Sequence, residues 1–472
     1  MKMSKTVIVW FRRDFRLNDH TALEKAIAYC EENDANWVGL FQLDPHFTEN
    51  IDLHHDYFFQ TVAQFQERCK EENLPFQIVY GDPIHVFEKV TDTLNVKAVF
   101  FNEDEAGYGA SRDKEVCNWL KEKEIESYNY QDYYLHGSQA VRKHDDTMYK
   151  VFTPYYKQWR TLKKPQVLHM DQKRLKKYAR ELNDALDDRT EFTSVLKRCR
   201  RDWKAIGEKS ANQRARRFAK ERLKDYDDHR DVPSLVGTSK LSPYLKTGTL
   251  SVRTLFYMVA ENDNKGAETF IQELAWRDFY GMVHAEFPEF RNCEFQTKYR
   301  GIPWNDDNEK LNKWKKGETG FPIVDAGMRQ LNQEGWMHNR LRMITASFLT
   351  KDYLIDWRHG ERYFEAKLID YDESSNTGGW QWASSTGTDA VPYFRIFNPT
   401  TQAERFDPDG TYIRKYVPEL KNVANKYIHQ PSKMSEEEQK ESSCVIGEDY
   451  PHPTVNHKEQ RQKVLSVYKE RT

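Results

Sequence analysis

The chain has 472 residues, and its 72 Lys and Arg against 74 Asp and Glu leave a net charge of −2 at pH 7. A chain of this length is expected to divide into at least two domains. Its balanced charge excludes a global field that attracts nucleic acid, so any DNA affinity must come from a local basic patch. No run approaches the ~20 apolar residues of a membrane span. The six cysteines lie apart without a CxxC pair, which predicts a cytoplasmic protein without a metal site or a disulfide framework.

Short apolar runs alternate with helical patterns over residues 1–130, which predicts a parallel sheet covered by helices on both faces. The first expected strand leads into Arg12-Arg13-Asp14-Phe15-Arg16 and not into G-x-G-x-x-G, so an ordinary dinucleotide fold loses its main support. We interpret these arginines as ion-pair partners that pin domains together, in preference to an anion site. The expected strands are 7–11, 37–43, 76–80 and 97–101, and the expected helices are 21–30, 55–69, 84–94 and 113–123.

The pattern changes twice beyond this region. Residues 131–195 are rich in Lys and Arg and then polar, which predicts a long, partly ordered connector. Residues 196–472 carry apolar residues at helical spacing, which predicts a larger all-α domain. After about residue 430 the chain is rich in Ser, Glu and Lys, and we expect a mobile tail or a loosely packed helix. The clearest helical patterns are 249–260, 267–287, 321–332 and 336–353.

A hydroxyl-rich turn enters an expected helix at Gly237-Thr238-Ser239-Lys240-Leu241-Ser242. Backbone N–H groups and hydroxyls at a helix start suit a pyrophosphate. An ordinary helix cap explains the same residues, and on this segment alone it is the favoured interpretation.

Two expected helices place acidic, basic and aromatic residues on one face. Glu273, Trp276, Arg277 and Tyr280 fall at i, i+3, i+4 and i+7. The second helix repeats this pattern, with Trp336, Asn339, Arg340 and Met343 predicted to share a face. Such a face carries either a surface ion pair beside a core indole or side chains that line a cavity. In such a cavity they would stack on a base and hydrogen-bond to it.

The run from Trp380 to Asp389, followed by Pro392 to Pro399, combines indoles, hydroxyls, a carboxylate and an arginine in one short segment. Asp370, Asp372 and Asn376 lie just upstream. Few folding reasons require so many polar groups beside so many rings, whereas a large planar polar ligand does.

Together these blocks resemble the DNA photolyase and cryptochrome family. The resemblance covers residues 6 to about 425 and is closest from Tyr226 onward. It implies an α/β antenna-type domain, a helical FAD- and DNA-binding domain, and light-driven repair of cyclobutane pyrimidine dimers by a deoxyribodipyrimidine photo-lyase. The matching blocks are 10–16, 237–245, 273–280, 319–326, 335–343 and 370–399.

The resemblance implies that excited, reduced FAD delivers an electron to the dimer and takes it back, without net redox change. Arg342 and Asp370 match an ion pair along the flavin ring. Asn376 matches the residue that faces flavin N5, where plant cryptochromes carry Asp, so Asn favours repair over signalling. The implied FAD positions are Tyr226, Thr238, Ser239, Lys240, Leu241, Ser242, Arg277, Asn339, Arg342, Asp370, Asp372 and Asn376.

The resemblance also implies a pocket for a flipped-out dimer in UV-damaged DNA. Glu273 matches the acid that hydrogen-bonds the pyrimidine carbonyl as charge develops. Indoles hold the dimer above a methionine, and arginines contact the flanking phosphates. The implied DNA-binding residues are Trp276, Arg340, Met343, Trp382 and Arg395, and the implied electron relay from the surface to the flavin is Trp304, Trp357 and Trp380.

Two alternative functions are found within the family. A (6-4) photolyase uses a pair of active-site histidines, and Met343 occupies one of the matching positions. A blue-light photoreceptor of the cryptochrome type, which signals through protein partners, usually adds a long regulatory tail, and only about 40 residues follow the end of the resemblance. A metabolic flavoprotein lacks support, because the sequence has no nicotinamide fingerprint.

The family implies a second, light-harvesting chromophore in the N-terminal domain. Its folate-type pattern has an Asn-Glu pair that aligns here with Tyr108-Gly109, whereas this chain has Asn102-Glu103 six residues earlier. This departure weakens the usual folate contacts. We rank 5,10-methenyltetrahydrofolate first, with a deazaflavin or a flavin open, and we expect a monomer.

Overall fold

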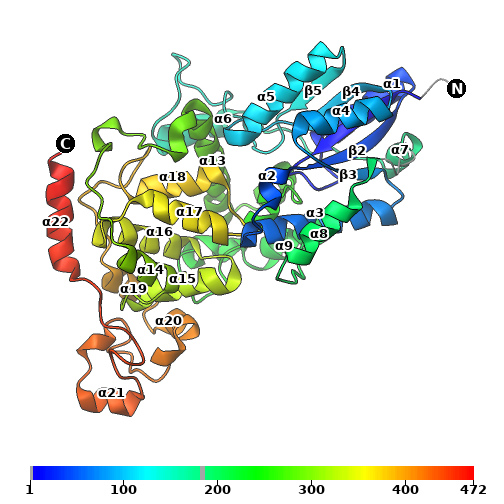
Figure 1. Cartoon of the computed structure of the whole chain (residues 1–472). Coiled ribbons are helices and arrows are strands. Elements are labelled where there is room, and N and C mark those ends of the chain that lie inside the picture. The colour runs from blue at the N-terminus through cyan, green and yellow to red at the C-terminus, as the bar shows by residue number, and fades with distance from the viewer. Residues whose placement is uncertain (1–3, 181–185, 472) are drawn as a thin grey trace. The chain divides into compact units, whose positions relative to one another are not determined.

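A computed structural model describes residues 4–180 and 186–471 (Figure 1). The chain forms two compact units. The first comprises Met1–Tyr149, Thr153–Leu223 and Ser239–Pro288, and the second comprises Lys150–Phe152, Lys224–Thr238 and Glu289–Thr472.

The first unit is built on a parallel sheet with the strand order β3-β2-β1-β4-β5. The central strand β1 pairs with β2 through Val9 and Gly39, and with β4 through Val9 and Phe100. The predicted α/β architecture is therefore confirmed. The strands are β1 (Thr6–Phe11), β2 (Asn36–Leu43), β3 (Phe76–Tyr80), β4 (Val96–Asn102) and β5 (Glu126–Tyr130).

Helices cover both faces of this sheet because the side chains of β1 alternate between two apolar layers. Val7 and Val9 join the core that includes the buried residues of α1 and α3, whereas Ile8 and Trp10 join the core of α4 and α5 (Figure 1). The helices assigned wholly or largely to this unit are α1 (Thr21–Asn33), α2 (Pro45–Thr48), α3 (Leu53–Glu71), α4 (Pro83–Thr93), α5 (Gly107–Glu122), α6 (Phe152–Thr161), α7 (Gln172–Lys177), α8 (Arg189–Arg198), α9 (Gly207–Glu221), α11 (Ser242–Lys246), α12 (Val252–Ala260) and α13 (Lys265–Glu286).

Ion pairs at the carboxyl end of β1 agree with the interpretation of its arginines as ion-pair partners. Arg12 pairs with Asp113, Arg13 with Asp104 at 2.5 Å, and Arg16 with Asp132. The pKa values of Asp104 and Asp132 lie below the usual range, because the neighbouring arginines outweigh the cost of burial. These three ion pairs join elements within the first unit, so the expectation that they pin domains together is wrong.

Two regions of this unit differ from the sequence prediction. The edge strand β5 was not predicted, because its residues Glu-Ser-Tyr-Asn-Tyr are mostly exposed and give no apolar run. The predicted connector contains α6, α7 and the start of α8, and Tyr155, Trp159 and Phe192 in these helices are buried. Isolated aromatic residues build this core without a long periodic pattern. Residues 181–185 of the connector lie outside the described residues.

The second unit is helical and encloses one large apolar core, to which α14, α15, α16, α17 and α18 all contribute. Its helices are α10 (Tyr226–His229), α14 (Asn308–Lys316), α15 (Pro322–Glu334), α16 (Asn339–Ser347), α17 (Trp357–Lys367), α18 (Glu373–Ala383), α19 (Pro399–Phe406), α20 (Thr411–Tyr416), α21 (Glu436–Ser442) and α22 (His457–Lys469). No helix among the described residues is long and apolar enough to span a membrane.

The helix predicted over 336–353 is shorter than expected. It begins at Asn339, because the His338 side chain caps it by accepting a hydrogen bond from the Arg340 N–H. Trp336 therefore precedes the helix, and the prediction that it shares a helical face with Met343 is wrong. The helix continues into a π-helical turn, η5 (Phe348–Asp352).

The expected loose packing of the C-terminal tail is also wrong. Val464 and Tyr468 of α22 are completely buried although most of that helix is polar. They lie four residues apart and therefore on one face, which is enough to dock a helix whose other residues are solvated.

Candidate cofactor and DNA-binding site

The helix α18 presents several candidate residues from the second unit. Asp372 is its N-cap and accepts a hydrogen bond from the Ser375 N–H at 2.9 Å. Asn376, Trp380 and Trp382 follow on the same helix, with Trp380 buried and the other two half-buried. One short, capped helix thus carries candidates for the cofactor, the relay and the DNA site.

Arg342 and Asp370 form an ion pair in this unit. Nη2 of Arg342 lies 2.8 and 3.1 Å from the two carboxylate oxygens of Asp370, and its Nε donates to the Met337 carbonyl at 2.9 Å. The Asp370 side chain is 2% exposed and that of Arg342 is 26% exposed. A guanidinium plane held at both ends, with part of its surface open, suits contact with a planar polar ring.

The amide of Asn376 is fixed by Glu361, a residue that the sequence analysis did not select. The Asn376 Nδ2 donates to the backbone carbonyl of Glu361 and to its Oε1, both at 3.2 Å. Tyr371 donates to the same Oε1 at 3.1 Å, and Arg291 lies 3.5 Å from the other oxygen. Burial raises the pKa of Glu361. Its role has no local sequence signal, because it comes from another helix, α17.

The three tryptophans of the predicted relay meet the same apolar core. Trp357 and Trp380 belong to it and are 0% and 2% exposed, and Trp304 is half-buried against it. A Cβ on Gly360 would lie 2.0 Å from the Trp380 ring, so the glycine is required for this ring position. The buried Nε1 of Trp380 has no hydrogen-bond partner among the described residues. Trp304 is therefore the most exposed of the three indoles, and the other two are buried.

The candidate DNA-binding residues of this unit lie in more exposed positions. Arg340 pairs with Asp231 at 2.6 Å, and its guanidinium lies 4.2 Å from the centre of the Phe406 ring. Asn339 donates to the sulfur of Met343 at 3.7 Å, which places these two on one face of α16. Trp382 lies 6.3 Å from Phe397 between ring centres, and Arg395 is exposed.

The first unit presents its candidates on the long helix α13. Trp276 lies 5.6 Å from both Phe279 and Tyr280 between ring centres. The Arg277 guanidinium lies 3.8 Å from the Tyr133 ring centre and donates to the Tyr133 carbonyl at 2.5 Å. Glu273 is one turn before Arg277, as predicted.

Asp278 anchors this helix and was not selected from the sequence. It accepts hydrogen bonds from the N–H groups of Leu135 and His136 and from Trp159 Nε1, at 3.3, 2.9 and 2.9 Å. Burial raises the pKa of Asp278 to about 6.

The predicted pyrophosphate turn is short. The Leu241 N–H donates to Ser239 Oγ at 3.3 Å, Lys240 has a positive φ of 53°, and α11 spans only Ser242–Lys246. Thr238 and the buried Tyr226, which begins α10, belong to the second unit.

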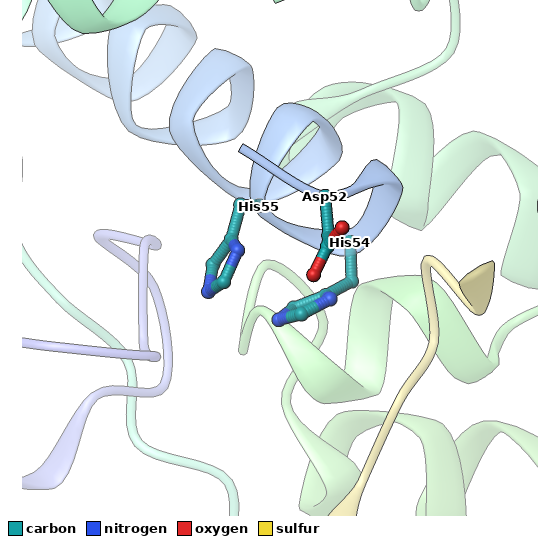
Figure 2. A group of neighbouring side chains, drawn as sticks. All are labelled: Asp52, His54 and His55. Carbon is teal, nitrogen blue, oxygen red and sulfur yellow. The ribbon is translucent and has the colours of Figure 1, made fainter. Parts of the chain in front are cut away.

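Asp52, His54 and His55 gather at the start of α3, with ligand-type atoms within 4.8 Å of one another (Figure 2). These are metal-ligand residue types, which the sequence analysis missed because adjacent histidines do not form a standard ligand spacing. Burial and the charge of Lys246 lower the pKa of His55 to about 4. A charge that disfavours a proton on this ring disfavours a divalent cation more strongly. We therefore assign no metal to this group.

Comparison with known proteins explains this arrangement. Residues 7–173 match the model "DNA photolyase", and residues 270–470 match the model "FAD binding domain of DNA photolyase". The deoxyribodipyrimidine photo-lyase of Alkalihalophilus pseudofirmus is 52% identical over 98% of this chain and 97% of its own length. The chain belongs to the DNA photolyase family. The deoxyribodipyrimidine photo-lyase of Escherichia coli is 37% identical over 98% of each chain.

Solved structures of photolyases and cryptochromes share the fold. A class III photolyase from Agrobacterium tumefaciens has a TM-score of 0.90 and 29% identity and covers 100% of this chain and 98% of its own. A Synechocystis cryptochrome has a TM-score of 0.88 and 28% identity and covers 99% of this chain and all of its own. The chain is thus a DNA-repair flavoprotein of the photolyase type with a FAD-binding domain.

The donor and acceptor groups of the second unit fit FAD. The half-open guanidinium of Arg342, the fixed amide of Asn376 and the carboxylate of Asp372 are the polar groups that the edge of a flavin ring needs. The buried N–H of Trp380, which has no hydrogen-bond partner among the described residues, belongs to the same helix as Asn376 and Asp372.

Proposed function

We propose that the chain repairs cyclobutane pyrimidine dimers in DNA with light. The observation that carries this proposal is the fixed amide of Asn376. Glu361 of α17 holds this amide, and Asn376 lies on α18 together with the half-buried Trp382. The 52% identity to a deoxyribodipyrimidine photo-lyase supports the substrate. When bound, FAD supplies the light-driven electron and takes it back.

In this proposal the candidate cofactor positions hold FAD. Arg342 and Asp370 would hold the flavin ring, Asp372 would bond its polar edge, and Asn376 would be the residue toward its N5 nitrogen. An amide has no acidic proton to give to that nitrogen. Tyr226, Arg277, Asn339 and the turn from Thr238 to Ser242 complete the set.

The chain's own residues hold the lesion. Trp276 and Trp382 stack on the flipped-out dimer above Met343, because aromatic faces compensate part of the stacking that the duplex loses. Glu273 hydrogen-bonds the pyrimidine carbonyl and stabilises charge as it develops there. Arg340 and Arg395 contact phosphates, which orient the duplex without reading its sequence.

We further propose that residues 1–130 form an antenna-type domain, 131–195 an interdomain connector, and 196–472 the catalytic domain of a cytoplasmic monomer. The antenna domain holds a second chromophore, with 5,10-methenyltetrahydrofolate ranked before a deazaflavin or a flavin. Asn102 bonds Asp14 and the Ala22 N–H inside the fold. A folate is therefore held by residues other than this asparagine. Acid extraction of the purified protein and mass spectrometry identify the chromophore.

The test is repair of an oligonucleotide with one cyclobutane thymine dimer by the purified, chemically reduced protein. Repair in near-UV light and none in the dark is the expected result. The alternative is a blue-light photoreceptor, which the likeness to a Synechocystis cryptochrome keeps open. Bound, reduced FAD without repair would favour that alternative.

A further inference from the structure

The chain turns sharply after α18, and this turn is held by two donors from distant segments. The Ser384 carbonyl accepts a hydrogen bond from the Tyr468 hydroxyl at 2.6 Å and from Lys351 Nζ at 3.0 Å. Lys351 also donates to Ser385 Oγ at 3.0 Å. Ser385 has a positive φ of 66°, a strained conformation for a residue with a side chain. The turn therefore depends on contacts beyond its own sequence.

Lys351 itself depends on Tyr468. Its side chain is buried, and Nζ lies 3.6 Å from the centre of the Tyr468 ring. A buried amine is costly unless it is hydrogen-bonded, and burial lowers the pKa of Lys351 well below its usual range. The Tyr468 ring packs on this amine and keeps water from it. Without the ring above it, Lys351 would draw water into the contact that fixes Ser384.

The same tyrosine also contacts the segment beyond the turn. The rings of Tyr468 and Tyr393 are parallel to within 9° with centres 6.0 Å apart. Tyr393 and Ile396 pack on a small apolar cluster that contains Val464 and Tyr468 of α22. Between them lie Phe394, which is 55% exposed, and Arg395, which is exposed. The inner residues of this segment are thus docked on α22 while its outer residues point to solvent.

The start of α22 is anchored to the same π-helical turn. His457 Nδ1 lies 2.5 Å from Asp352 Oδ1, and Asp352 is the neighbour of Lys351. His457 and Tyr468 are separated by eleven positions, about 16 Å along a helix. Two contacts at this separation fix both the position and the direction of α22 (red in Figure 1).

We propose that α22 acts as a clasp, with Tyr468 as a positioning residue that holds residues 384–398 ready for DNA. This inference deepens the proposed function, on which it rests. A preformed segment loses less conformational freedom on binding, and that saving appears as affinity. Tyr468 itself need not touch DNA, FAD or the lesion.

The direct test is hydrogen exchange of the holoprotein, which needs no DNA. Tyr468→Leu removes the ring and the hydroxyl, and Tyr468→Phe removes the hydroxyl alone. We expect amide exchange in residues 384–398 to quicken by about tenfold or more in Tyr468→Leu, which corresponds to about 1.4 kcal/mol of lost local stability. Tyr468→Phe should have a smaller effect. Lys463→Ala, on the exposed side of α22, is the matched control.

Residues 322–334, which form α15, are the internal reference. Faster exchange there, or loss of bound FAD, would mean general destabilisation and would contradict a positioning role. Unchanged exchange in 384–398 in Tyr468→Leu would also overturn the proposal.

The functional test compares binding and turnover. Tyr468→Leu should bind a duplex with one thymine dimer more weakly, with an unchanged repair rate at saturating DNA, and Tyr468→Phe should recover most of the affinity. Equal affinity for all variants would contradict the clasp. If the wild-type protein repaired no dimer, the proposal that cyclobutane dimers are its substrate would be wrong. Hydrogen exchange would still show whether Tyr468 holds residues 384–398 in place.

Discussion

The amide nitrogen of Asn376 lies 3.2 Å from Oε1 of Glu361, and this contact sets which way the amide points. The NH2 group faces Glu361, so the carbonyl oxygen is directed elsewhere. Glu361 is buried and also contacts Tyr371 and Arg291, which hold the carboxylate in turn.

Glu361→Gln should therefore loosen the orientation of Asn376. A glutamine side chain presents both a donor and an acceptor, so only the backbone carbonyl of residue 361 would still specify which way the Asn376 amide points. We expect FAD affinity to fall by about 1–3 kcal/mol, the usual cost of an unsatisfied buried polar group. Titration of apoprotein with FAD measures it. Glu365→Gln, which changes another carboxylate near Arg291, is the control, and equal loss in both variants would refute the special role of Glu361.

Trp380→Phe should abolish photoreduction of the oxidised flavin and leave repair by chemically reduced protein intact. Phenylalanine fits beside Gly360 but is a far poorer electron donor than indole. Trp314→Phe is a close control, because Trp314 lies 5.9 Å from Trp380 in the same core and is not part of the predicted relay. Absorbance during blue illumination measures the effect. Photoreduction that survives in Trp380→Phe, or is lost equally in Trp314→Phe, would exclude the assigned relay.

The sequence predicted well what depends on repeating patterns. Four of the five described strands, the main helices around the sheet and the long helix α13 follow from apolar periodicity. The edge strand β5 escaped because an edge strand is half solvated and needs no apolar run. The start of α16 was misplaced because Trp336 continues the apolar pattern while His338 caps the helix.

The candidate site was predictable only where short motifs carried it. Glu361 contacts Asn376, 15 residues along the chain on the next helix, whereas Asp278 and Tyr468 contact Leu135 and Ser384, which are 143 and 84 residues away. Nothing in their local sequence marks such pairs. The tail was judged by its polar composition, whereas two buried residues on one face were enough to dock it.

Arg340→Ala should weaken binding to damaged and undamaged duplex alike and flatten the salt dependence. Loss of one phosphate contact lowers the slope of log K against log salt by about 0.9. We expect the opposite change in DNA affinity for Asp231→Asn. Its carboxylate lies 2.6 Å from Arg340 and competes with phosphate, so removing that charge should tighten binding. Fluorescence anisotropy at several salt concentrations measures both, and weaker binding in Asp231→Asn would mean that Asp231 orients the arginine for DNA.

Glu273→Ala should lower the yield of repair per absorbed photon while FAD stays bound. The carboxyl group is expected to act on the pyrimidine carbonyl, where one such electrostatic contact is worth roughly 3 kcal/mol in related chemistry. Glu268→Ala removes an exposed carboxylate from the first turn of the same helix and is the control. Yields are read from the recovery of thymine absorbance under calibrated light. An unchanged yield in Glu273→Ala would remove this residue from the mechanism.

The titration of Asp278 should lower the free energy of unfolding of the first unit as pH rises from 4 to 7. Burial raises its pKa from 3.8 to about 6, so the folded state binds its proton more tightly than the unfolded chain does. The stabilisation is complete below the unfolded pKa and is lost as pH rises through about 6, and its upper limit is about 3 kcal/mol. Arg277 and Lys164 face the carboxylate and oppose the shift. Paired carboxylates such as Asp132, whose pKa is lowered, change stability in the opposite direction.

The comparison of wild type with Asp278→Asn isolates this one group, because all other titrations are shared. We expect Asp278→Asn to be less stable than wild type at pH 4.5, because an amide is a poorer acceptor for the three N–H groups that contact Asp278. The difference in stability should shrink towards pH 7. Urea unfolding followed by tryptophan fluorescence at both pH values gives the two differences. A difference that stays the same from pH 4.5 to 7 would show that Asp278 is ionised in the folded protein throughout this range and is stabilised by its three hydrogen bonds.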